Sequence, residues 1–253
     1  MVKKVSKKNL GMKEHIFQTF SLIFKNWKLF LPLSVIAVVV CLALVGVTMD
    51  TLILMGMFIF LFLWLVSLFF TRQILAGRKV KFSDGIYNAM TPLIATLLIL
   101  ILVAIQCVPI FLLIIAYAAA LETHLFYNFF YVLLFGLFAS MMIAISGFLL
   151  SDTLIALMAV SAPGMYPWRA LKLANGLMKG RRSRFVIRLV MMGIVLTLIW
   201  VVAFLPVALL ALVAKVPFIL AATLVFVLSS FSVIYMAVYL YIYYRGLIGY
   251  DKK

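Results

Sequence analysis

LIATLLILILVAIQCVPIFLLIIAYAA, residues 93–119, is a long run without a single charged side chain. A helix rises about 1.5 Å per residue, so about 20 apolar residues cross the roughly 30 Å hydrocarbon core of a bilayer. The run is also uniformly apolar, unlike the alternating segments of roughly ten residues that form outer-membrane barrels. The segment therefore predicts a transmembrane helix.

Runs of the same kind occupy most of the chain. Hydrophobic residues make up 68% of the sequence and the mean hydropathy is +1.29, more than a water-soluble core can bury. We predict an all-α polytopic integral membrane protein with one transmembrane domain, residues 29–245, between a basic N-terminus, 1–28, and a tail, 246–253. Its six predicted spans are residues 29–45, 52–71, 93–119, 126–150, 189–213 and 217–243.

The cationic residues predict the orientation of these spans. The chain has 22 Lys and Arg residues against six acidic ones, and all the cations except Lys215 fall on one side of the predicted membrane. Positively charged loops are retained in the cytoplasm, which predicts cytoplasmic N- and C-termini. The partners expected for these charges are anionic lipid headgroups at the cytoplasmic face, each worth about 1 kcal/mol, and no nucleic acid.

Three cytoplasmic segments are predicted to form short interfacial helices. The clearest is Met12–Asn26, where apolar residues recur at helical spacing opposite charged ones. The second follows Ser83, a predicted N-cap, to Met90, and the third begins at Pro167 and ends at Lys179. Each precedes a pair of spans, and this order indicates a threefold internal repeat. Alternatively, the likeness arises because topology alone places cations before spans.

Asp152 is the one carboxylate that interrupts a long apolar stretch, which runs from Phe126 to Val160. Depending on where the span ends, Asp152 lies at the cytoplasmic interface or inside the membrane. Its expected partner is Arg188, at the cytoplasmic end of the fifth span. Such a pair serves as an ion or proton relay or a substrate contact. Alternatively, it is a purely structural pair, or the two side chains reach the headgroups separately.

Further polar and breaking residues lie within the spans. Gln106 beside Pro109 predicts a polar contact and a helix kink in the third span, and Pro206 predicts a second kink in the fifth. Either kink serves helix packing or opens a binding site. In the sixth span the serines suit close helix contact, while Tyr235 to Tyr244 suit an interfacial aromatic belt.

No catalytic constellation is evident in the sequence. The two histidines, His15 and His124, are predicted on opposite sides of the membrane, and Cys41 and Cys107 lie in separate spans. No HExxH helix, carboxylate dyad, phosphate-binding loop or dinucleotide motif occurs. We therefore expect no catalytic or metal-binding residues, no cofactor and no enzymatic activity.

Two segments carry a family resemblance. Residues 161–185, with Ala170-Leu171 near the start of a short helix and Lys179-Gly180 at its end, resemble a pattern in six-span bacterial and archaeal membrane proteins. Those proteins are related to the membrane domain of glycerophosphodiester phosphodiesterases, and residues 24–31 look like their usual entry to the first span. An acidic residue often precedes the short helix in that group, whereas residues 160–166 contain none. The resemblance implies six spans in a bacterial or archaeal plasma membrane, without the phosphodiesterase domain.

The leading functional hypothesis is a non-enzymatic membrane scaffold or accessory subunit. One alternative is a transport permease, such as the membrane half of an ATP-driven exporter, whose partner would be an ATPase docking on a cytoplasmic helix. Another is a lipid-modifying membrane enzyme, which would need polar residues converging at one membrane depth.

Overall fold

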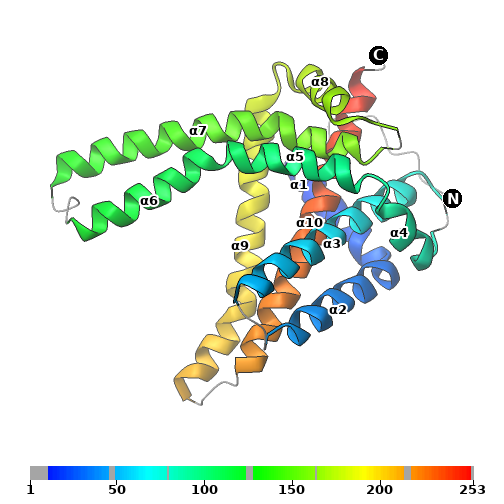
Figure 1. The fold of residues 1–253 in the computed structure, drawn as a ribbon, viewed down its shortest axis with the longest axis horizontal. Helices are drawn as coiled ribbons and strands as arrows, with labels where there is room; N and C mark the ends of the chain where they lie inside the picture. Colours follow the sequence, from blue (N-terminus) through cyan, green and yellow to red (C-terminus); the bar gives the residue numbers. More distant parts are fainter. Residues whose placement is uncertain are drawn as a thin grey trace. The chain divides into compact units, whose positions relative to one another are not determined.

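The computed structural model describes residues 11–45, 49–78, 80–123, 128–162, 164–213 and 218–251, and within these ranges every regular element is a helix (Figure 1). Several predicted features lie outside them: residues 1–10 of the basic N-terminus, the first residues of the fourth and sixth spans, His124, Lys215 and the two C-terminal lysines. The chain forms two compact units. Unit 1 comprises Met1–Leu93 with Arg188–Lys253, and unit 2 comprises Ile94–Ile187.

The long apolar helices agree with a membrane-embedded protein. Five are long and apolar enough to cross a bilayer, and a sixth span results if two consecutive helices, joined at a sharp bend, count as one. The five are Ile53–Leu75, Leu93–Glu122, Phe129–Val160, Arg182–Leu209 and Ile219–Gly249. The helical fold class and the approximate span positions follow the prediction, although most helices extend several residues beyond the predicted limits.

The bent pair forms the predicted first interfacial helix and first span. Helix α1, Met12–Lys25, meets α2, Trp27–Ala43, at an angle of 82°. Asn26 sits at the break, where its side chain donates a 2.8 Å hydrogen bond to the Leu22 carbonyl and takes up an acceptor at the end of α1. With 17 residues, α2 is about 25 Å long, somewhat shorter than a typical span.

Helix α10, Phe218–Asp251, is the centre of unit 1. It packs against α1, α2 and α3, the last of these being Met49–Leu75. Its tyrosines form much of this core: Tyr235 and Tyr239 are fully buried, and Tyr243 and Tyr244 nearly so. The predicted interfacial belt is thus wrong for these four residues, because α1 and neighbouring helices cover the side of α10 that carries them.

The second predicted interfacial helix is α4, Phe82–Ala89, which packs against α3. It begins one residue before the predicted cap, so Lys81 rather than Ser83 occupies the N-cap position. Gly85 faces the ring of Phe70 so closely that an added Cβ would lie 2.6 Å from Phe70 Cζ. The small residue permits this close approach of two helices.

Unit 2 contains the predicted third and fourth spans. The third is divided into α5, Leu93–Gln106, and α6, Val108–Glu122, with the break at Cys107. Pro109 lies in the first turn of α6, where a missing N–H costs least, so the break falls two residues before the predicted kink. Helix α7, Phe129–Val160, runs back beside α6. At Pro206, by contrast, helix α9, Arg182–Val213, is continuous.

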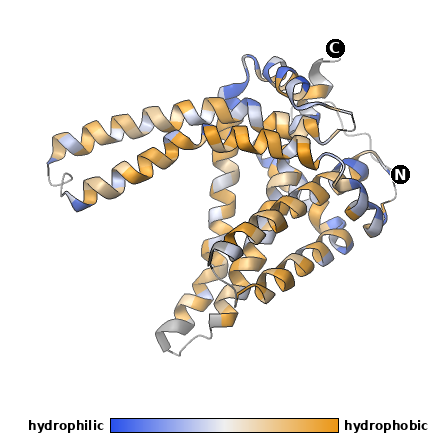
Figure 2. Ribbon diagram, in the orientation of Figure 1, coloured by the Kyte–Doolittle hydropathy of each residue, from blue (hydrophilic) through white to orange (hydrophobic). Residues whose placement is uncertain are grey.

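Helix α8, Pro167–Met178, is the third predicted short helix, and Pro167 is at its first turn as expected. It packs on α7 through the buried residues Ala170, Ala174, Leu177 and Met178, leaving Trp168 78% exposed. Hydrophilic residues gather on α8, whereas α5, α6 and most of α7 are apolar (Figure 2). The helices thus follow three times the order of a short helix and two long segments, and the repeat itself remains a prediction.

Candidate functional site

The most polar site in unit 2 is centred on Asp152, on the second half of α7. Both carboxylate oxygens accept hydrogen bonds from Arg182 at the start of α9: Nε donates to Oδ1 at 3.1 Å and Nη2 to Oδ2 at 2.6 Å. The predicted partner was Arg188, so this pairing is corrected. Sequence reasoning missed Arg182 because it began the fifth span at residue 189, whereas the helix already begins at Arg182.

Asn175 on α8 completes this arrangement, since its Oδ1 accepts a 2.9 Å hydrogen bond from Arg182 Nη2. Three elements thereby converge on one guanidinium group. The ion pair is partly exposed, with 34% of the Arg182 side chain and 21% of the Asp152 side chain accessible. Two parallel hydrogen bonds between a guanidinium and a carboxylate fix the direction of both groups better than a single contact does.

A groove of about 680 Å³, here called the basic groove, lies beside this pair. Its lining includes Phe148, Lys172, Asn175, Gly176, Lys179 and Arg182. Asp152 compensates one of the three cations. Among the described residues of unit 2 the other carboxylate is Glu122, at the far end of α6, so the charges of Lys172 and Lys179 are not compensated locally. The groove therefore favours an anion.

Gln106 makes the interhelical contact expected of an intramembrane polar residue. Its Oε1 accepts a 2.7 Å hydrogen bond from the hydroxyl of Thr153 on α7, and Thr153 is almost fully buried. Thr153 follows Asp152 directly, so neighbouring residues of α7 bind α5 through one side chain and Arg182 through the other. The hydrogen bond of Gln106 therefore joins α5 to α7 one residue away from the ion pair of Asp152 with Arg182.

A second polar cluster, in unit 1, was not anticipated. His15 on α1 is buried, with its ring 5.4 Å from that of Tyr239 and 6.0 Å from that of Tyr243, between ring centroids. Arg188 lies over the ring of Tyr243, 5.0 Å from its centroid, and its carbonyl accepts a hydrogen bond from the Tyr239 hydroxyl. Arg188 is therefore a component of this cluster.

The environment of His15 favours the neutral imidazole. Burial, and to a smaller extent the positive charge of Arg188, lower the pKa of His15 to about 4. The residue lies on α1, before the first long helix. From the sequence, His15 was considered only as a member of a catalytic pair, and no such pair was expected. The feature that could have indicated a core position is its place beside Ile16 on the apolar side of α1.

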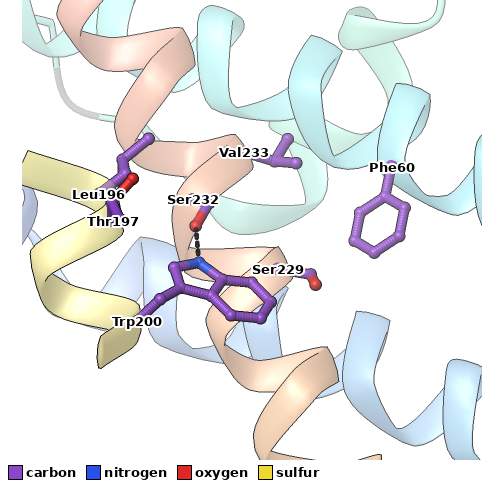
Figure 3. Close-up of a pocket in the computed structure, with 7 residues that line it drawn as sticks. All are labelled: Phe60, Leu196, Thr197, Trp200, Ser229, Ser232 and Val233. Carbon is purple, nitrogen blue, oxygen red and sulfur yellow. Dashed lines mark hydrogen bonds between the residues drawn. The ribbon is translucent and has the colours of Figure 1, made fainter. Parts of the chain in front are cut away.

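Another cavity, of about 590 Å³, lies among α3, α9 and α10 in unit 1 (Figure 3). Its walls are mainly apolar, with Phe60 standing across from the indole of Trp200. The indole N–H donates a 3.0 Å hydrogen bond to the Ser232 hydroxyl, which in turn donates to the Leu228 carbonyl. The Ser232 side chain thus supports the close helix contact predicted for the serines of this span.

These clusters contain no recognisable metal centre: in the described parts of the chain, no three His, Cys, Asp or Glu side chains gather as ligands. Both cysteines are free thiols, Cys41 on α2 and Cys107 at the break between α5 and α6. The residues of the basic groove can attract and orient an anion. The hydrogen-bonded polar pairs of the long helices can hold neighbouring helices together.

Comparison of the chain with protein-family models, with curated proteins and with solved structures gives no match. The resemblance to the membrane domain of glycerophosphodiester phosphodiesterases therefore remains a prediction from sequence.

Proposed function

We propose that this chain is a non-enzymatic membrane scaffold or accessory subunit of a bacterial or archaeal plasma membrane, with both termini in the cytoplasm. The observation that supports the proposal is how polar side chains of the long helices are used. Gln106 binds Thr153, and Trp200 binds Ser232, each across two helices. Such hydrogen bonds stabilise helix association in a bilayer. The orientation is supported by the distribution of Lys and Arg in the sequence.

The apolar surface of unit 2 fits a protein that contacts other membrane components. Along α6 and the first half of α7, large side chains such as Phe111, Ile115, Phe129 and Leu137 are more than half exposed. Exposed apolar surface of this extent requires lipid or another membrane protein to cover it.

The test is a mild-detergent pulldown of the tagged protein from its native membrane, followed by mass spectrometry of co-purifying proteins. We expect another integral membrane protein in stoichiometric amount, retained when Asp152 is replaced by Asn. Recovery of lipid with no stoichiometric protein would overturn the accessory role. A changed lipid composition in cells carrying Asp152→Asn would favour a lipid-modifying enzyme instead.

A permease is the second candidate, and the surface of α4 favours it. Tyr87 is 85% exposed, and Ile86 and Met90 beside it are exposed as well. A short helix with apolar residues on its free side suits the docking of an ATPase. Co-purification of an ATPase with the wild-type protein, and its loss from Tyr87→Ala, would replace the scaffold proposal with this one. Trp168→Ala on α8 is the control, since it removes a comparably exposed aromatic residue elsewhere.

A further inference from the structure

We propose that the basic groove is a binding site for the headgroup of an anionic phospholipid, with the phosphate held by Lys172, Lys179 and Arg182. The inference deepens the proposed function, because it assigns a discrete lipid site to a protein whose cytoplasmic face is expected to contact anionic lipid in general.

Arg182 is already oriented for this role. A guanidinium group has five N–H bonds. Three of them are used in the hydrogen bonds that Nε and Nη2 donate to Asp152 and Asn175, and the two on Nη1 remain for a ligand. Because Asp152 and Asn175 fix the plane of the group, a phosphate meets donors in a preformed geometry and little side-chain freedom is lost on binding.

The two lysines provide the attraction. Lys172 lies on α8 and Lys179 directly follows that helix, and both are exposed at the groove. With Arg182 neutralised by Asp152, the lining carries two uncompensated positive charges, which matches a phosphate of one to two negative charges. The ammonium groups are flexible, so they can close on the phosphate after it enters.

The lining also contains an apolar element, which favours a lipid over free phosphate. Phe148 lies on α7 one helical turn before Asp152, and its ring is about half exposed. Along this side of α7 the surface therefore changes from an apolar spanning helix to a charged site within one turn. A phospholipid has the same order of groups, with acyl chains and glycerol next to the phosphate.

Gly176 keeps the groove open and offers a way to close it. An added Cβ at this position would meet no atom within 4 Å, and the residue lies in regular helix, so a side chain there projects into free space without disturbing α8. Gly180 is different: its φ of +73° forms the turn between Lys179 and α9, a conformation that favours glycine.

The experiment measures lipid retention by native mass spectrometry on the full-length protein, purified in mild detergent and titrated with short-chain phosphatidic acid, phosphatidylglycerol or phosphatidylcholine. We expect the two anionic lipids to bind and phosphatidylcholine to bind at least about tenfold more weakly. Gly176→Glu should lower affinity for the anionic lipids by about tenfold or more, since a carboxylate in the groove repels phosphate. Gly176→Ala should retain most of the affinity.

A second comparison separates a discrete site from general attraction. The double variant Lys172→Gln/Lys179→Gln should lose anionic-lipid binding, whereas Arg169→Gln, which removes an exposed cation elsewhere on α8, should not. Equal losses in both would overturn the proposal and leave diffuse electrostatic contact. Displacement of the lipid by millimolar inorganic phosphate would show that the groove takes free phosphate instead.

The melting temperature of each variant in detergent checks that its fold is retained. These measurements use the purified protein, so they can succeed or fail independently of the pulldown that tests the scaffold proposal. Loss of the co-purifying protein with lipid binding intact would overturn only the proposed function, and the reverse result only the lipid site.

Discussion

Asp152 on α7 and Arg182 at the start of α9 form a two-point ion pair, with Nη2 and Oδ2 at 2.6 Å and Nε and Oδ1 at 3.1 Å. The connection joins residues separated by the whole of α8, so it fixes the start of α9 against α7.

We expect Asp152→Leu to lower the free energy of unfolding by about 1 kcal/mol or more, because it leaves the Arg182 guanidinium without its carboxylate. Thermal melting in detergent measures the effect. In a double-mutant cycle, Asp152→Asn should couple to Arg182→Gln by about 0.5 to 1 kcal/mol. The matched control is Arg188→Gln. Coupling of Asp152 to Arg188 and none to Arg182 would contradict the observed pairing.

Thr153→Val should weaken the contact between α5 and α7. The substitution keeps the shape of the side chain and removes the donor to Gln106 Oε1. Interhelical hydrogen bonds in membranes contribute about 0.6 kcal/mol on average, so we expect a loss of that order, measured as the urea or thermal stability in detergent. Thr197→Val, at an exposed hydroxyl that donates within its own helix, is the control and should change stability less.

Gly85→Ala should destabilise unit 1 although alanine is the better helix former. The new Cβ would overlap the ring of Phe70, which is fully buried against Phe30 and Phe82 and cannot easily move. We expect a cost of about 1 to 3 kcal/mol. Gly136→Ala on α7, where an added Cβ meets nothing within 4 Å, should be neutral or slightly stabilising. Equal melting temperatures for the two variants would argue against the close approach of α4 to α3.

Stability should fall as the pH decreases from about 6.5 to about 4, in part because of His15. Its folded-state pKa of about 4 lies below the ordinary value of 6.5, so in this range the unfolded chain binds a proton that the folded protein does not. The contribution is fully present above pH 6.5. Melting wild type and His15→Gln at pH 7.5 and pH 5 checks this, and the variant should lose less stability between the two. Identical losses would show that His15 is not responsible.

Much of the architecture follows from local sequence because a long apolar run has one stable form in lipid: a helix satisfies all its backbone hydrogen bonds internally. The same local logic gives α1, the first turn of α8 at Pro167 and the break beside Pro109. Helix α9 is continuous through Pro206, so this proline does not interrupt the helix, and the kink predicted there stays a prediction.

The partner of Asp152 could not be predicted from sequence, because the choice among neighbouring arginines depends on where α9 begins and how α8 lies on α7. The tyrosines of α10 were equally ambiguous: spacing and amphipathic chemistry fit an interfacial belt, and only the packing of α1 and neighbouring helices against α10 makes them core residues. By itself, the sequence determined that the chain is helical, apolar and rich in cations, since these properties depend on composition and local backbone hydrogen bonding. The tertiary structure decided which polar groups meet, with Lys172, Lys179 and Arg182 gathered at one groove, because such contacts depend on the distances between helices.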